Sequence, residues 1–162
     1  MVNDSPRNAW FVWFSLFVAL LLSIAPIPEF MAVGRPLWLP LLVSFWLLMA
    51  PQQIGTTRIW LLGLVLDVLC GTLLGYNALL LSLLVSMVLS LQQRLRLFPL
   101  WQQSLALLVL FGLVQLVQLW LDSLGGNRAP SLLALLPALV SALLWPWITA
   151  VMQFFCRRLH VY

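Results

Sequence analysis

The chain has 162 residues, of which 64% are hydrophobic and only 7% are charged, and its mean hydropathy is +1.07. This composition is typical of an integral membrane protein and excludes a separate soluble catalytic domain. The net charge of +4 comes from arginines that stand singly or in pairs at the ends of apolar runs, which favours a role in membrane topology over nucleic-acid binding.

A transmembrane helix needs about 20 residues, so the chain has room for about six spans. We therefore predict an all-α integral membrane protein, a compact bundle of about six transmembrane helices that forms a single domain over residues 1–162. The predicted spans are 10–25, 37–53, 59–74, 77–92, 103–121 and 131–154.

The first apolar run follows Arg7 and ends at Pro26 and Pro28, because proline cannot continue a helical hydrogen-bond ladder. A basic residue before an apolar run also describes a signal peptide. We interpret the run as a retained first helix, with cleavage as the alternative. Arg35-Pro36 then precedes the short second run, which begins beside Trp38.

The third run contains the acid that stands out most in the sequence. Gly63, Asp67, Gly71 and Gly75 recur every four residues, which predicts one stripe along a helix face. Small residues at this spacing let a neighbouring helix approach closely in lipid, and a carboxylate there must face the protein interior. We predict that this stripe is the packing centre of the bundle.

The fourth run carries serines at the same four-residue spacing, at Ser82, Ser86 and Ser90. A tight turn joins the third and fourth runs, so the two helices should be neighbours. We predict that the serine face packs on the glycine face, with Ser86 as the nearest donor to Asp67. In the alternative, each serine bonds to its own helix backbone.

The segment 92–103, between the fourth and fifth runs, is basic and aromatic. Arg94 and Arg96 favour lipid headgroups, and Trp101 suits the membrane interface. An acidic protein partner is the alternative.

The fifth run carries a polar face and the last run carries a proline. Gln115, Gln118 and Asp122 lie at spacings of three and four, where they can bond to a neighbouring helix or line a cavity. Pro146 interrupts the last run between Trp145 and Trp147.

Counting arginines gives the orientation. Six spans with an internal N-terminus place six arginines in the cytoplasm and two outside, so both chain ends should be cytoplasmic. The inner set is Arg7, Arg58, Arg94, Arg96, Arg157 and Arg158, and the outer pair is Arg35 and Arg128. Cys70 and Cys156 then lie toward opposite faces, which predicts free thiols.

No catalytic constellation, metal site or cofactor site is predicted. The only histidine, His160, has no acid near it in sequence. Asp67 is the one candidate for proton or ion chemistry, but a relay needs several titratable groups in series. We interpret Asp67 as a hydrogen-bonded packing residue, with ion-linked transport as the alternative.

The motifs together resemble the proteobacterial form of the rod shape-determining MreD family, over residues 10–155. Four segments carry the resemblance: Arg35-Pro36-Leu37-Trp38, the stripe from Gly63 to Gly75, Leu100-Trp101-Gln102-Gln103 and Leu144-Trp145-Pro146-Trp147. Members of the family often carry acids late in the fifth helix, where this chain has Gln115 and Gln118.

The resemblance implies a non-enzymatic, multi-pass protein of the bacterial cytoplasmic (inner) membrane. Its expected direct partner is MreC, with MreB filaments, a RodA-type glycosyltransferase and a transpeptidase as members of the same complex. Membrane lipids are further expected partners, nucleic acid is not, and self-association is left open. The family's similarity in fold to the substrate-binding subunits of energy-coupling-factor transporters implies the alternative, a small-molecule-binding subunit. The predicted partner surface comprises Arg35, Pro36, Trp38, Arg94, Arg96, Trp101, Trp145, Pro146 and Trp147.

Overall fold

The computed structural model describes residues 6–26, 28, 29, 34–126 and 131–158, and the side chains from Trp10 onward within them. The elements are α1 Pro6–Ile24, α3 Trp38–Met49, α4 Thr56–Cys70, α5 Tyr76–Leu95, α6 Leu100–Leu124, the 3-10 helix η1 Leu132–Leu135 and α7 Leu136–Arg158. The predictions that concern Arg7, Arg128 and His160 fall outside the described side chains.

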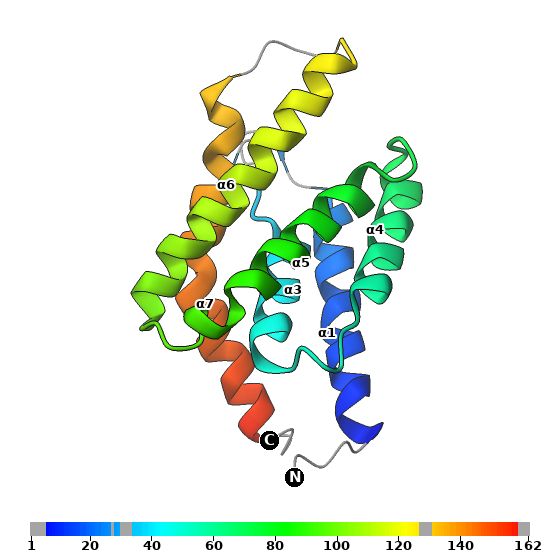
Figure 1. Cartoon of the computed structure of the whole chain (residues 1–162). Helices are drawn as coiled ribbons and strands as arrows, with labels where there is room; N and C mark the ends of the chain where they lie inside the picture. The colour runs from blue at the N-terminus through cyan, green and yellow to red at the C-terminus, as the bar shows by residue number, and fades with distance from the viewer. Residues whose placement is uncertain (1–5, 27, 30–33, 127–130, 159–162) are drawn as a thin grey trace.

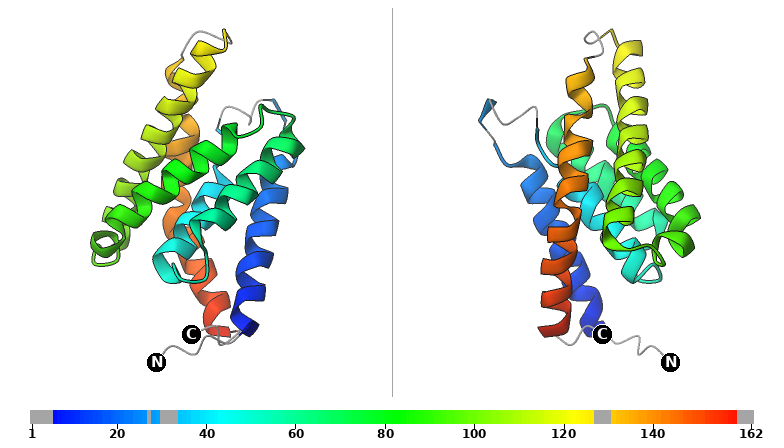
Figure 2. Two further views of the ribbon diagram at one scale, coloured as in Figure 1. Left: turned by 45° about the vertical axis from the view of Figure 1, so that its right-hand side comes forward. Right: turned by 90° about the vertical axis from the view of Figure 1, so that its left-hand side faces the viewer.

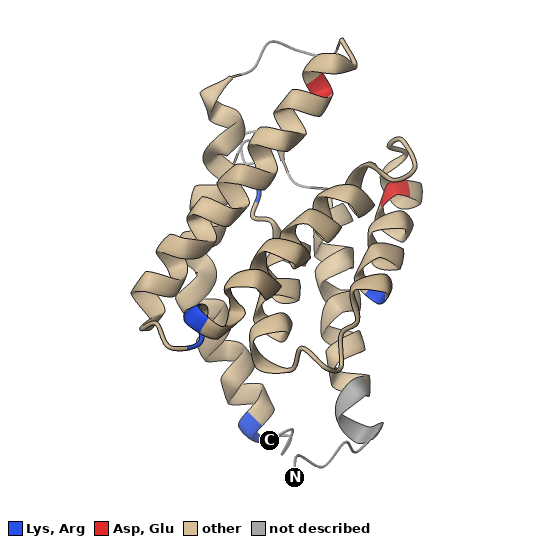
Figure 3. Ribbon diagram, in the orientation of Figure 1, with Lys and Arg blue, Asp and Glu red and all other residues tan. Residues whose placement is uncertain are grey.

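Successive helices run in alternating directions, so the start of α1 and the end of α7 lie at the same end of the bundle (Figure 1). The α4–α5 pair forms a hairpin, and α6 lies beside α7 in all views (Figure 2). The basic residues at the ends of α5 and α7 lie toward the end where α1 begins, whereas Arg35 lies near the end of α1, and Asp67 and Asp122 belong to helix segments near that same end (Figure 3).

The central helix is α3, which packs against α1, α5 and α7. Every residue from Leu41 to Leu48 is buried, and the indole Nε1 of Trp46 donates a 2.8 Å hydrogen bond to Ser15 Oγ on α1. A helix of 12 residues is about 18 Å long, shorter than the hydrocarbon core. Because protein surrounds α3 on several sides, its ends can be satisfied by other helices instead of by water.

The all-α class is confirmed, and each of the six predicted spans overlaps one of the six α-helices in the described residues. Three segments have the length and apolarity of a full span: Tyr76–Leu95, Leu100–Leu124 and Leu132–Arg158. Trp10–Ile24 and Trp38–Met49 are shorter apolar helices. The third predicted span is too long, because α4 ends at Cys70 and does not continue to residue 74.

Both cysteines are free thiols, as expected. Cys70 is exposed at the end of α4, and Cys156 is buried in the last turn of α7. These two helix ends lie at opposite ends of the bundle, which keeps the thiols apart (Figure 1).

Candidate functional site

Asp67 is fully buried in the last turn of α4 and caps the first turn of α5. Its Oδ1 accepts hydrogen bonds from Thr72 Oγ1 at 2.9 Å and from the Asn77 N–H at 2.8 Å. Its Oδ2 accepts from the Gly75 N–H at 2.9 Å and from the Ala78 N–H at 3.4 Å. The N–H groups of a first helical turn have no partner within their own helix, and they carry partial positive charge. The Asp67 carboxylate accepts from three of these backbone N–H groups at the start of α5, and from the Thr72 hydroxyl as well.

The predicted continuous stripe is wrong at Gly71 and Gly75, which lie in the turn between α4 and α5. Gly71 ends α4 with a φ of 64°, and Gly75 precedes α5 with a φ of 96°. Both values lie in the left-handed region, which glycine adopts without the steric cost that a Cβ imposes. These glycines therefore shape the loop that brings the α5 amides to Asp67, and they do not form a helix face.

Gly63 is the one glycine of the predicted stripe where two helices approach closely. A Cβ built on Gly63 would lie 2.4 Å from Ala78 Cα, which is closer than real Cβ contacts. Since Ala78 also donates to Asp67, the close approach and the cap occur at the same place along α5. The helix pair is fixed by one contact between backbones and one capping carboxylate.

The predicted pairing of Ser86 with Asp67 is also wrong. Ser86 Oγ donates to the Ser82 carbonyl at 2.8 Å, and Ser82 donates to Leu79 on the same helix. Ser86 is exposed, so the serine face does not pack on α4. These hydroxyls bond to backbone carbonyls of their own helix, which is the alternative that the sequence left open.

Tyr76, the first residue of α5, connects this turn to α6. Its hydroxyl donates a 2.7 Å hydrogen bond to Asp122 Oδ1, and Gln118 also lies within hydrogen-bonding reach of it. The position of Tyr76 follows from the Asp67 cap on the next two amides of the same turn. Asp67 therefore helps to place a link between the α4–α5 hairpin and α6.

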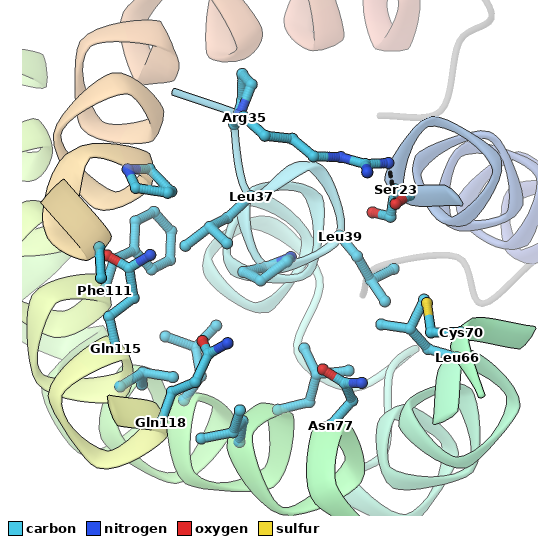
Figure 4. A pocket seen from close by; sticks show the side chains of 18 of the residues that line it. Ser23, Arg35, Leu37, Leu39, Leu66, Cys70, Asn77, Phe111, Gln115 and Gln118 are labelled. Atoms are coloured by element: carbon cyan, nitrogen blue, oxygen red, sulfur yellow. Dashed lines mark hydrogen bonds between the residues drawn. The ribbon is translucent and has the colours of Figure 1, made fainter. Parts of the chain in front are cut away.

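Beside this link lies a partly open cavity of about 380 Å³ among the ends of the helices (Figure 4). Leu80, Leu84 and Phe111 form part of its apolar wall. Figure 4 shows the carboxamides of Asn77 and Gln118 directed toward its centre, with the Arg35 side chain along its rim toward Ser23. Asp67 does not line the cavity, although its hydrogen-bond partner Asn77 does.

Other helix ends near the cavity are also capped by side chains from elsewhere in the fold. Arg35 Nη2 donates to the Leu22 carbonyl at 3.0 Å and to the Ser23 carbonyl, both in the last turn of α1. Ser141 Oγ on α7 accepts from the Leu37 N–H before α3 at 2.8 Å, and Gln115 Oε1 on α6 accepts from the Ala138 N–H of α7 at 3.2 Å. These bonds satisfy backbone groups for which lipid offers no partner.

At the opposite end of the bundle, side chains from other segments also cap helix ends. Arg96 Nε donates to the Leu48 carbonyl near the end of α3 at 2.6 Å. Gln103 Nε2 donates to the Leu95 carbonyl at the end of α5 at 2.9 Å, while its Oε1 accepts from Trp145 Nε1 at 3.3 Å. Arg94 is exposed in the last turn of α5.

The predicted partner surface divides into exposed and interior residues. Trp101 and Trp147 are exposed at 67% and 74%. Trp145 is only 1% exposed and bonds to Gln103, so its assignment to the surface is wrong: its indole is long enough to reach the capping glutamine across α6 and α7. Pro146 lies within α7, which continues unbroken through it, and Pro36 lines the cavity. Trp38 is partly buried in the first turn of α3.

The capping role of several polar residues was not predicted from the sequence. It concerns Thr72, Tyr76, Gln103 and Ser141, and each has a general signal: a polar side chain near an apolar helix end in a chain with few polar groups. Among the described residues, no group of three His, Cys, Asp or Glu side chains could hold a metal ion.

Two comparisons with known proteins agree with this description. The family model described as rod shape-determining protein MreD matches residues 6–155. The rod shape-determining protein MreD of Haemophilus influenzae is 31% identical over 154 residues, which cover 94% of this chain and 95% of that protein. No solved structure matches. By its sequence and by the length over which the match extends, the chain belongs to the MreD family of rod shape-determining proteins.

Proposed function

We propose that this protein is a non-enzymatic scaffold of the cell elongation machinery, which binds MreC directly and helps to couple MreB filaments to peptidoglycan synthesis by a RodA-type glycosyltransferase and its transpeptidase partner. Family membership supports a role in cell shape. The partner assignments follow from that membership and are part of the proposal.

One observation carries the scaffold proposal: several polar side chains inside the bundle hold helix ends together, while many large apolar side chains face outward. Asp67, Gln103 and Ser141 all have partners within the fold. In contrast, Leu97 between α5 and α6 and Trp101 in the first turn of α6 are 85% and 67% exposed. Interior polar groups that bond helices to one another, together with aromatic side chains on the outer surface, suit a protein that binds other proteins within the membrane.

We further propose that all six helices cross the cytoplasmic membrane and that α1 begins and α7 ends on the cytoplasmic side. The basic residues at the ends of α5 and α7 support this orientation, because arginines favour the cytoplasmic side. The connection that carries Arg94, Arg96 and Trp101 would then face the cytoplasm.

Ion-linked transport through Asp67 receives less support from the geometry. Each carboxylate oxygen already accepts two hydrogen bonds, and three of the four donors are backbone amides. Releasing or taking up a proton at Asp67 would disrupt the cap of α5. A residue with this arrangement is suited to a fixed structural role.

Co-purification tests the proposal. The protein and MreC are expressed together, and retention of MreC is measured for the parent and for the variants Trp101→Ala and Trp147→Ala. Trp10→Ala is the matched control, since Trp10 is also exposed, at 72%, but lies on α1 outside the predicted partner surface. We expect the parent and the control to retain MreC and at least one of the other variants to lose it. A well-folded parent that never retains MreC would refute the direct interaction.

A further inference from the structure

The cavity among the helix ends presents polar groups that the fold itself does not use. Gln115 is only 5% exposed and lines this cavity. Its Oε1 bonds to the Ala138 N–H, while its Nε2 has no hydrogen-bond partner among the described residues. This amide donor is accessible from the cavity, so a bound molecule that accepts a hydrogen bond can pair with it there.

Two further carboxamides face the same space from across it. Asn77 on α5 uses its Nδ2 in a 3.3 Å bond to Thr72, which leaves its Oδ1 without a partner among the described residues. Gln118 on α6 is directed toward the centre of the cavity and also lies within hydrogen-bonding reach of the Tyr76 hydroxyl (Figure 4). The cavity therefore offers both hydrogen-bond donors and acceptors, held on rigid helices above an apolar wall.

The two charged residues that line the cavity are already partnered within the fold. Arg35 bonds to carbonyls at the end of α1, and Asp122 accepts from Tyr76. Their charges are opposite, so together they favour neither an anion nor a cation. A carboxylate head could only accept hydrogen bonds and an ammonium head could only donate them, whereas a neutral amide does both.

We propose that this cavity binds a neutral, mainly apolar small molecule whose head both donates and accepts hydrogen bonds, as a carboxamide does. The carbonyl of the head accepts from Gln115 Nε2, its N–H donates to the oxygens of Asn77 and Gln118, and its apolar body lies against Leu80, Leu84 and Phe111. A volume of about 380 Å³ falls in the range of small-molecule pockets. This inference is independent of MreC binding.

Photolabelling tests the proposal on the full chain in lipid nanodiscs. The probe is an eight-carbon amide with a diazirine at the end of its chain, and labelled residues are mapped by mass spectrometry. Octanamide and octanoate, which share the chain but differ in the charge of the head, serve as competitors. We expect saturable labelling of cavity-lining residues on α5 and α6 that octanamide suppresses and octanoate does not.

The variants separate binding in the cavity from partition into lipid. Gln118→Leu removes one hydrogen bond to the head and should raise the half-saturating concentration about fivefold, as expected for a neutral hydrogen bond. Ala134→Leu fills the cavity from η1 without removing a described hydrogen bond, and should abolish saturable labelling. Gln93→Leu is the matched control, because Gln93 is exposed at the other end of α5.

Each variant is compared only after gel filtration shows a monodisperse protein, so that misfolding is not read as loss of binding. Labelling that does not saturate, or that octanoate suppresses as well as octanamide, would overturn the proposal, because any acyl chain would then enter. Saturable labelling that persists unchanged in both Gln118→Leu and Ala134→Leu would overturn it too.

Discussion

At the scale of single residues, several polar side chains share one role, which is to satisfy backbone groups at the ends of other helices. A helix embedded in lipid cannot leave its terminal N–H and C=O groups to water, so another group must satisfy them. Asp67 does this for the start of α5, and Arg35 does it for the end of α1. Neutral side chains such as Ser141 and Gln103 fill the same role, which suits a membrane in which charged groups are costly.

Substitutions of Asp67 test whether the fold needs a carboxylate at this position or only a polar side chain. In Asp67→Asn, one acceptor oxygen becomes an amide donor facing donors, so we expect stability to fall by about 1–3 kcal/mol. Asp67→Leu removes all four bonds and should cost more. The thermal midpoint in detergent micelles measures both effects. The neighbouring exposed residue supplies the control, and Val68→Asn should change the midpoint little. Equal midpoints for the parent and Asp67→Leu would contradict the capping role.

Three glycines should respond differently to alanine, each for its own reason. Gly63→Ala places a methyl group against the Ala78 backbone and should cost about 1–3 kcal/mol through overpacking. Gly71→Ala meets no neighbour but must adopt a positive φ, at about 1–2 kcal/mol. Gly112 is helical with open space around it, so Gly112→Ala should be neutral or slightly stabilising. Chemical or thermal unfolding in micelles ranks them. A Gly63→Ala protein as stable as the parent would remove the close-approach argument.

At the scale of elements, periodicity in the sequence locates the helices but not the way in which their ends are joined. Each apolar run predicted one helix, because burial in lipid requires a continuous hydrogen-bonded segment. The four-residue spacing of Gly71 and Gly75 equally fits a helix stripe and a turn, since glycine is favoured in both settings. Only the tertiary arrangement distinguishes them.

The polar contacts could be predicted less well than the helices. Ser86 and Asp67 lie at similar distances from the turn in sequence, which suggested a contact, but the direction of a side chain around its helix depends on packing. The pairing of Tyr76 with Asp122 spans 46 residues and has no local signal. The face that carries Gln115 and Gln118 was identified correctly as polar, and the alternative of a cavity lining agrees with its position.

The two arginines near the end of α5 allow a matched test of whether one helix end is capped by a side chain from another element. Arg96 bonds to the Leu48 carbonyl of α3, and Arg94 is exposed in the last turn of its own helix. Arg96→Leu should therefore lower stability by about 1.5–3 kcal/mol, the value of a hydrogen bond from a charged group, and Arg94→Leu should have little effect. Thermal unfolding of both variants measures the difference. Similar losses in both would assign the effect to charge and not to the cap.

At the scale of the whole molecule, the bundle places its helix ends in two layers: the arginines at the ends of α5 and α7 lie in one, and the cavity with Arg35 on its rim lies in the other. Alternating helices bring the start of α1 and the end of α7 together (Figure 1). This arrangement follows from an even number of antiparallel helices, and it makes the orientation testable with single cysteines.

Maleimide labelling in spheroplasts checks the orientation. In a Cys156→Ser background, Cys70 is the remaining thiol, exposed at the end of α4 near the cavity. We expect a membrane-impermeant maleimide to label Cys70 from outside. A thiol introduced by Gln93→Cys in a Cys70→Ser, Cys156→Ser background should be labelled only after permeabilisation. The reverse pattern would invert the proposed topology, and labelling of both positions from outside would refute the single crossing by α5 that separates them.

The central claim is that side chains from elsewhere in the fold cap the helix ends and thereby hold the bundle together. Backbone hydrogen exchange of three amides tests it most directly: Leu37, Asn77 and Ala138, which are bonded to Ser141, Asp67 and Gln115. We predict that all three exchange slowly in the parent. Ser141→Ala, Asp67→Leu and Gln115→Leu should each accelerate exchange at its own partner and leave the other two protected. Fast exchange of these amides in the parent, or no change at the partner amide in any variant, would contradict the account.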